Sequence, residues 1–374
     1  MARKKIKIPT LRDLQKKFPG QYVPGQVDES KTPWLPSRCL ALNKVMGGGI
    51  PFGKILELFG EESSGKSLLA YDFAYCAQYL GGVVLWVDAE QSFTNSWASE
   101  NGLDLNRVVV YRNTSIEAIS DWVASQALYW RTQLTHNEPV LLVLDSVSAL
   151  DTDNNIDSEM MAASQDMGNR AKAIYKYFRI RNEMLYSLGI TQVYINQLRK
   201  NLKAGMFEDP DTTPGGKALA FYAHIRIGMY GGKQLTKKVN GKERKVGRIT
   251  SIRTKKNKVA PPGPTLKGTP IYNNPKYVDV GIDRLHFLDE ILIEEEIVEK
   301  SKAGVFTFKG KTLCRGADKF TKLLAEDDEL RRKLIKKAHI NTLGTTKKLL
   351  ESIETNLYPV DGVEDDEYED SDDE

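Results

Sequence analysis

The chain contains 374 residues, 41% of them hydrophobic, and carries a formal net charge of +3. This length supports one large hydrophobic core with one or two smaller units. No apolar run approaches the roughly 18 residues that a membrane-spanning helix needs, so we expect no membrane partner. Cys39, Cys76 and Cys314 share no metal-binding spacing, and reduced thiols of this kind indicate a cytoplasmic protein.

The charge is distributed unevenly along the chain. Residues 361–374 hold ten carboxylates and no basic side chain, so residues 1–360 carry a net charge of +13. A basic body with an acidic tail indicates a polyanionic partner. The alternative is a tail that only improves solubility.

Residues 1–35 are expected to form a small N-terminal module on a linker. Ile8, Leu11, Leu14 and Phe18 recur at helical spacing, and Pro19-Gly20 ends the pattern. Further prolines punctuate the stretch that follows.

Residues 36–270 alternate apolar runs with amphipathic stretches. The runs KILELFG, VVLWVDAE, VLLVLDS and ITQVYINQ fit strands buried on both faces, joined by helices over 66–80, 115–131 and 167–188. The predicted fold class is therefore α/β, with a mostly parallel sheet flanked by helices. Because each run ends in polar residues and such sheets bind ligands at the carboxyl ends of their strands, one site is expected there.

Residues 271–350 are expected to form a small α+β domain. GVFTFKGKTLCRG is typical of a hairpin, and EDDELRRKLIKKAH has acids first and bases last, which suits a helix dipole. Residues 351–374 are expected to be an acidic, disordered tail.

A phosphate-binding loop is the clearest motif. Eight consecutive residues satisfy G-x-x-x-x-G-K-[ST], and they are Gly60, Glu61, Glu62, Ser63, Ser64, Gly65, Lys66 and Ser67. Backbone N–H groups of such a loop surround phosphates at a helix N-terminus. We expect ATP and Mg²⁺ as cofactors, with Lys66 on the terminal phosphates and the Ser67 hydroxyl on the metal.

Residues at three strand ends complete the expected site. Asp145 ends an apolar strand and is predicted to hold the metal, although an acid there can also be a simple solubilising cap. Asp88 and Glu90 are two residues apart, which places them on one face of a strand end. Glu90 is our candidate for the base that deprotonates water. Gln197 is a candidate γ-phosphate sensor, but amides also cap strand ends.

The order of motifs resembles that of the bacterial RecA recombinases. The segments that carry the resemblance are GGGIPFGKILELFGEESSGKS, VDAE, VLLVLDSVSAL, YINQLRK, TTPGGKALAFYA and KKNKVAPP. The resemblance is close over about residues 36–262 and looser over the C-terminal domain. The N-terminal 35 residues match poorly, as in a divergent, bacteriophage-encoded member.

The resemblance implies a RecA-type P-loop ATPase core and assigns roles within it. Glu90 becomes the catalytic glutamate, Gln197 the γ-phosphate switch, and Trp97 the aromatic that stacks on adenine. A tryptophan in place of the family's usual tyrosine preserves a stacking face. Thr94 stands where the family usually has an aspartate near the adenine.

Two DNA-binding loops are also implied, over about 155–168 and 199–216. Gly-Gly turns and helix N-termini contact phosphates without reading bases, which suits DNA of any sequence. The alternative is two mobile surface loops. The expected DNA-binding residues are Met167, Gly168, Lys172, Lys176, Arg179, Arg199, Gly215, Gly216 and Lys217. Met167, like Met206 and Phe207, offers an apolar surface for spread bases or simply belongs to the core.

Residues 233–258 contain eleven lysines or arginines against one acid, Glu243. Most are expected to form a solvated face or a DNA-facing hairpin. Lys256 and Lys258 match family positions that reach into a neighbour's ATP site and are predicted to act in catalysis there. The family often has a further lysine where this chain has Ala220.

The implied function is a DNA-dependent ATPase that forms helical filaments on single-stranded DNA. It pairs that strand with homologous duplex DNA and exchanges strands, in recombination, repair and the SOS response to DNA damage. Its other expected partners are itself, through the N-terminal helix, and single-strand-binding and loader proteins. The alternatives are a RecA-fold ring helicase and a non-catalytic scaffold that ATP holds together.

Overall fold

The computed structural model describes residues 33–153, 163–200, 211–215, 217–261 and 263–343. The helix expected over 5–18, the tail and Gly216 lie outside these ranges, as do residues 155–162 of the first expected DNA-binding loop and residues 201–210 of the second. Every other element expected from the sequence lies at least partly within them.

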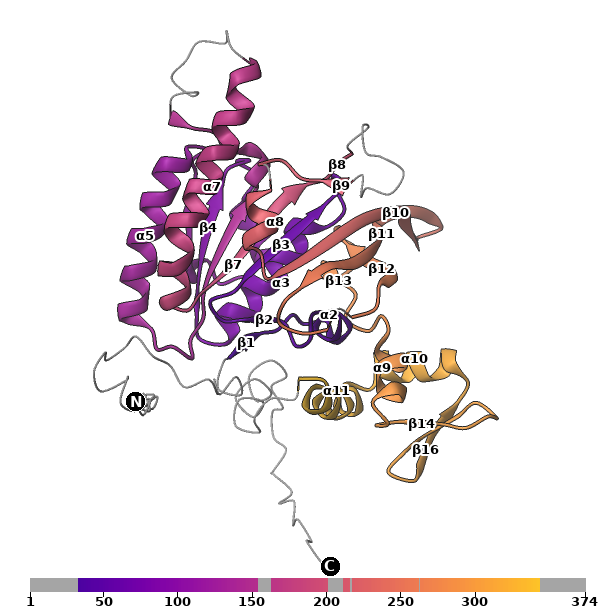
Figure 1. Cartoon of the computed structure of the whole chain (residues 1–374). Coiled ribbons are helices and arrows are strands. Elements are labelled where there is room, and N and C mark those ends of the chain that lie inside the picture. Colours follow the sequence, from indigo (N-terminus) through magenta and orange to yellow (C-terminus); the bar gives the residue numbers. More distant parts are fainter. Residues whose placement is uncertain (1–32, 154–162, 201–210, 216, 262, 344–374) are drawn as a thin grey trace, which may run out of the picture.

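A mixed sheet of nine strands forms the centre of the molecule, in the order β13-β12-β11-β10-β3-β7-β6-β4-β5 (Figure 1). Neighbouring strands from β10 to β5 are parallel, and β11, β12 and β13 continue the sheet antiparallel. The bounds are β3 Ile55–Gly60, β4 Val83–Asp88, β5 Val108–Tyr111, β6 Val140–Asp145, β7 Ile190–Gln197, β10 Ile225–Val239, β11 Lys242–Asn257, β12 Leu266–Tyr272 and β13 Gly281–Ile282.

Helices cover both faces of this sheet. Figure 1 shows α5 and α7 side by side on one face. The helices are α2 Leu40–Met46, α3 Lys66–Tyr79, α4 Asn95–Glu100, α5 Ile116–Gln133, α7 Ala163–Ser187, α8 Ala218–Tyr222, α9 Leu288–Glu294, α10 Ala317–Glu326 and α11 Asp328–Leu343, with 3₁₀ turns η2 Leu105–Arg107 and η3 Val147–Ala149.

Strand residues divide alternately between two hydrophobic clusters. In β4, Val84 and Trp86 pack in the cluster that contains α3, whereas Val83, Leu85 and Val87 pack in the cluster that contains α5 and α7. The whole of β4 is buried. This burial on both faces explains why the parallel strands are continuous apolar runs. The expected mostly parallel α/β sheet is confirmed.

The expected crossover helices are present, with one shifted start. α3 and α5 lie close to the ranges 66–80 and 115–131. α7 begins at Ala163, so Met167 and Gly168 belong to a helix and the first expected DNA-binding loop ends earlier than residue 168. The run from Ala163 to Met167 contains no helix breaker, which allows the helix to start before Gly168.

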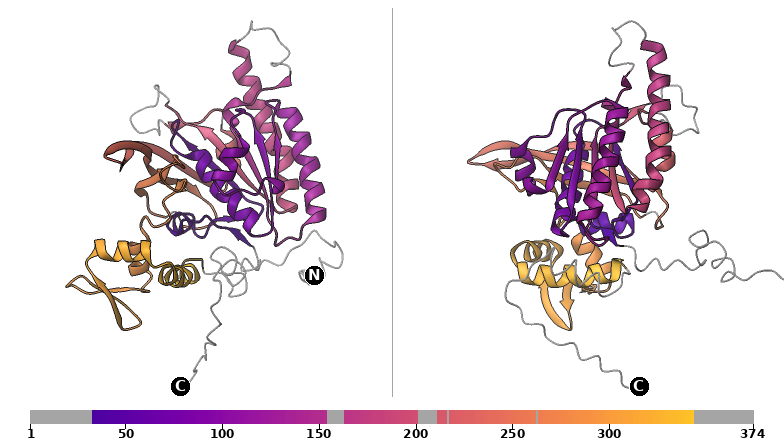
Figure 2. Two further views of the ribbon diagram at one scale, coloured as in Figure 1. Left: turned by 180° about the vertical axis from the view of Figure 1, so that it is seen from behind. Right: turned by 90° about the vertical axis from the view of Figure 1, so that its left-hand side faces the viewer.

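A long antiparallel hairpin leaves the body at one side of the sheet. β10 and β11 run together from Ile225 and Asn257 to a turn after Val239. Both views of Figure 2 show the hairpin projecting beyond the remainder of the sheet. It carries ten of the eleven basic residues of 233–258, since Lys258 follows the end of β11, and it places Lys237 directly opposite Arg244.

The part of the chain that follows β13 contains short strands and helices, whereas residues 271–272 and 281–282 of the expected C-terminal domain belong to the large sheet. The predicted hairpin is β15 (Val305–Phe308) with β16 (Lys311–Arg315), extended by β14 (Glu299–Lys300). The predicted charged helix is α11. Figure 1 shows these elements below the large sheet, next to α2.

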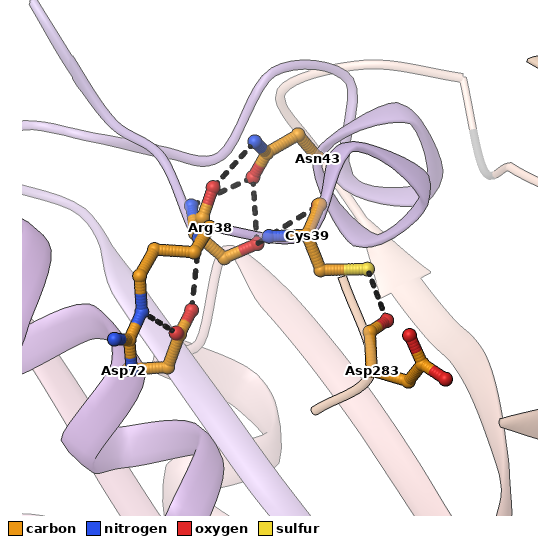
Figure 3. A network of polar contacts seen from close by, with 6 residues as sticks. Arg38, Cys39, Asn43, Asp72 and Asp283 are labelled. Carbon is orange, nitrogen blue, oxygen red and sulfur yellow. Dashed lines mark hydrogen bonds and ion pairs between the residues drawn. The ribbon is translucent and has the colours of Figure 1, made fainter. Parts of the chain in front are cut away.

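The segment before α2 is fixed to the main body. β1 (Trp34–Leu35) pairs with β2 (Ile50–Pro51). Arg38 donates to Asp72 of α3, and the Cys39 thiol lies 3.8 Å from the Asp283 carbonyl (Figure 3). These contacts join the start of the described chain to both α3 and the segment that follows β13.

Candidate functional site

The P-loop connects β3 to α3, as the motif predicts. Gly65 has a φ of +97° just before the helix. β10 passes so closely that a Cβ atom on Gly60 would lie 2.1 Å from the Met229 carbonyl oxygen. The two glycines are therefore required by backbone geometry at one position and by close packing at the other.

Three carbonyl groups of the loop accept hydrogen bonds from the side chains of Lys66 and Thr250. The Lys66 ammonium donates to the Gly60 and Glu61 carbonyls, at 3.1 and 2.6 Å. Thr250 of β11 donates to the Ser64 carbonyl at 3.1 Å. Because such loops bind phosphates through N–H groups, this arrangement suits an anion site. Burial lowers the pKa of Lys66, while nearby carboxylates, Asp145 first among them, oppose that shift.

A hydroxyl and a carboxylate meet where the metal is expected. The Ser67 hydroxyl donates to the Asp145 carboxylate at 2.8 Å. Burial is the main cause that raises the pKa of Asp145 to about 6, opposed by the Ser67 bond and Lys66 and reinforced by Glu90 and Asp88. Two adjacent hard oxygen ligands fit Mg²⁺, which keeps several waters and takes few protein ligands.

Glu90 lies just beyond β4, and its backbone is held by β6. The amides of Ala89 and Glu90 both donate to the Asp145 carbonyl, at 2.8 and 3.2 Å. β4 ends at Asp88, so the alternation expected between Asp88 and Glu90 stops there. Asp88 is fully buried, whereas Glu90 is exposed.

Asp88 shapes the segment that carries Glu90. Its carboxylate accepts bonds from the Ser92 and Phe93 amides and from the Arg112 guanidinium at 3.1 Å. Arg112 also donates to the Phe93 carbonyl. Sequence reasoning missed Arg112, which no local motif marks.

Gln197 is the last residue of β7 and pairs with Gly60 of β3. Its side chain is exposed at the strand end. Lys66, Ser67, Asp145, Glu90 and Gln197 thus gather at the carboxyl ends of neighbouring strands, where the sequence predicts one site.

Trp97 lies in α4, half-buried against the cluster that contains α3. Thr94 is the N-cap of this helix, and its hydroxyl accepts a bond from the Trp97 amide at 3.3 Å. The threonine oxygen therefore has a structural partner.

The expected DNA-binding residues fall into two groups. Lys172, Lys176 and Arg179 are exposed on α7 at spacings of four and three, which places them on one helix face. Gly168 lies on the same helix in open space. The second group is Arg199, Gly215 and Lys217.

The ends of the second loop are joined. Arg199 is in β8 (Arg199–Lys200) and pairs with Thr212 of β9 (Asp211–Thr212). Gly215 has a φ of +87°. Lys217 is the N-cap of α8.

Lys256 and Lys258 lie away from the P-loop of their own chain. Arg226 pairs with Lys256 and Met229 pairs with Gly60, which separates Lys256 from the loop by roughly 10 Å along the sheet. The Lys256 ammonium donates to the Ala220 and Phe221 carbonyls at the end of α8, at 2.7 and 2.9 Å. Burial is the main cause that lowers the pKa of Lys256 to about 8, and Lys258 and Arg226 add to it.

The sheet order and the P-loop geometry define a P-loop nucleotide-binding protein of the α/β class. The family model described as RecA N-terminal domain matches residues 6–274. The chain belongs to the RecA family, whose members are DNA-dependent ATPases. It is a recombinase that acts in DNA recombination and repair. The match begins well before residue 36, so the family likeness extends further toward the N-terminus than the motifs alone indicate.

Individual relatives agree with the family match. Protein RecA of Corynebacterium diphtheriae is 30% identical over 379 residues, which cover 99% of this chain and 95% of that protein. Protein RecA of Frankia casuarinae is 31% identical, over 90% of this chain and 92% of its own length. Protein RecA of Streptococcus pyogenes is 30% identical, over 90% and 86%. Within the described residues, no helix combines the length and apolarity needed to cross a bilayer.

Proposed function

We propose that the chain hydrolyses ATP with Mg²⁺ at this site while assembled as a helical filament on single-stranded DNA, and that it pairs this strand with homologous duplex DNA. The observation that carries the proposal is the gathering of Lys66, Ser67, Asp145, Glu90 and Gln197 at one edge of the sheet. The metal, when bound, neutralises charge on the phosphates.

Each residue has a role in the proposed reaction. The P-loop amides and Lys66 hold the phosphates, and Ser67 with Asp145 provides the metal ligands. Glu90 takes a proton from water as the water oxygen bonds to the γ-phosphorus. The bond from that phosphorus to the β,γ-bridging oxygen breaks, and ADP leaves with the electron pair. Gln197 bonds the γ-phosphate and loses that bond when phosphate departs.

We also propose that Lys256 and Lys258 act on the ATP of a neighbouring subunit. Their distance from the P-loop of the same chain supports this assignment. Cations supplied in trans can raise hydrolysis rates by about 10³ to 10⁵. Trp97 would stack on adenine, and the exposed cations of α7 with Arg199, Gly215, Gly216 and Lys217 would contact the DNA backbone. Met167 would offer an apolar surface to spread bases.

A mixing experiment tests the trans arrangement. Lys66→Ala subunits lack a working ATP site, and Lys256→Ala subunits lack the donated cation, so each alone is expected to be inactive. In a random mixture of equal amounts, about a quarter of the interfaces join the intact ATP site of a Lys256→Ala subunit to the intact Lys256 of a Lys66→Ala subunit. Recovery of turnover supports the proposal, and a mixture as inactive as its components contradicts it.

Microscopy and a pairing assay test the wider proposal. With a non-hydrolysable ATP analogue and single-stranded DNA, open helical filaments are expected, and closed rings would favour a helicase instead. Joint-molecule formation should require a homologous duplex and fail with a heterologous one. Glu90→Gln should retain filaments and lose turnover, whereas Glu100→Gln, at the exposed end of α4, should keep both. Unchanged turnover in Glu90→Gln contradicts the assigned base.

A further inference from the structure

A chain of two serine hydroxyls ends on Glu90. Ser146 directly follows Asp145 and is fully buried. Its hydroxyl donates to the Glu90 carboxylate and also bonds to the hydroxyl of Ser148 on η3. A hydroxyl has one proton to donate. Because Ser146 gives its proton to Glu90, Ser148 is the donor to Ser146.

Glu90 needs such a partner because of its position. It follows the last residue of β4, and its side chain is exposed. A free glutamate side chain samples many rotamers, and ordering it costs conformational entropy. The backbone bonds from Ala89 and Glu90 to the Asp145 carbonyl fix where this side chain begins. They do not fix where its carboxylate points.

The two serines stand on a rigid support. Ser146 continues from β6, which is paired on both sides by β4 and β7. η3 is closed by the Ala149 amide bonding to the Ser146 carbonyl at 3.1 Å. Val147, between the two serines, is buried among residues of α5, α7 and β7. Both hydroxyls are therefore placed by the core of the protein, whereas Glu90, which accepts the bond from Ser146, is exposed.

We propose that Ser146 and Ser148 are positioning residues that hold the carboxylate of Glu90 in the orientation that accepts a proton from the attacking water. This inference depends on the proposed function, because it presumes that Glu90 is the base. Ser148 acts through Ser146, since it contacts Ser146 and not the carboxylate. Bonds in such a chain also polarise one another, so Ser148 strengthens the bond that Ser146 makes.

Ser148→Ala tests the proposal, with turnover on single-stranded DNA measured across ATP concentrations. We expect kcat to fall by about tenfold and the KM for ATP to change less than about twofold, because orientation is lost while the phosphate contacts remain. Ser148→Thr keeps a hydroxyl and should recover most of kcat. Ser187→Ala removes an exposed hydroxyl bonded to the Met184 carbonyl and should match the parent protein.

A double variant separates positioning from a general structural effect. Because Ser148 acts through Glu90, Ser148→Ala should change the residual rate of Glu90→Gln by less than about twofold. An equal loss in both backgrounds, an unchanged kcat in Ser148→Ala, or no recovery in Ser148→Thr overturns the inference. Absence of DNA-dependent turnover in the parent protein overturns the proposed function instead, so the two failures are distinguishable.

Discussion

Replacing Asp145 by asparagine is expected to stabilise the metal-free protein while it removes a magnesium ligand. Asp145 is 3% exposed, and burial raises its pKa from 3.8 to about 6. The folded state therefore holds a proton that the unfolded state has released between these two values. Stability falls as pH rises through this window and remains lower above it.

The structure sets the size of this effect. A difference of about two pKa units corresponds to about 3 kcal/mol of unfolding free energy at neutral pH. Asparagine is uncharged, so it avoids this loss, and its side-chain oxygen can still accept the bond from Ser67. At about pH 5 the parent protein has regained roughly half of the unfolding free energy that it loses at neutral pH by ionising Asp145.

Urea unfolding with a metal chelator, at about pH 7.5 and about pH 5, provides the assay. Asp145→Asn should be more stable than the parent by up to about 3 kcal/mol at the higher pH and by about half as much at the lower one. Asp121→Asn, whose side chain is 84% exposed, should differ by less than about 0.5 kcal/mol. A variant no more stable than the parent at the higher pH, or a gap that is the same at both, refutes the reasoning.

Three further predictions concern charge. Arg226→Ala should lower the unfolding free energy by about 3 to 5 kcal/mol because it leaves the buried Glu57 without its ion pair. The control is Arg181→Ala, whose ion-pair partner Asp121 is exposed, and it should lower the unfolding free energy by about 1 kcal/mol or less. Equal losses of the two variants in urea unfolding contradict the prediction. The share of ATP turnover that depends on Lys256 should fall as pH rises through about 8, where the Lys256 ammonium loses its proton. In Lys256→Arg the side chain stays charged, so the pH–rate profile should not show this fall. Deleting residues 361–374 should tighten duplex binding at matched salt, and unchanged affinity in titrations excludes competition by the tail.

The elements that the sequence predicted best are those whose signal is local. β3, β4, β6 and β7 are continuous apolar runs because both faces of the sheet are covered. The P-loop is a contiguous motif, so its position between a strand and a helix followed directly.

The parts that the sequence could not predict join distant positions. The Ser146 bond to Glu90 spans 56 residues, and the Thr250 bond to the Ser64 carbonyl spans 186. Single serines and threonines are common, and nothing near them in the chain marks these contacts. The start of α7 differs for another reason, because the end of the first loop at residue 168 was implied by the family resemblance, whereas in the structure α7 begins at Ala163 and Gly168 lies at an exposed position of it.

Strand β11 has a mechanical consequence for the proposed filament. Thr250 donates a hydrogen bond to the P-loop of its own chain. Lys256, which we propose acts on the nucleotide of the next subunit, lies roughly 20 Å further along the same strand. β11 is paired with β10 between these points, so it resists stretching. In the proposed filament, a shift at one nucleotide is therefore expected to move the cation that acts on the next, so that successive sites along the DNA are mechanically coupled.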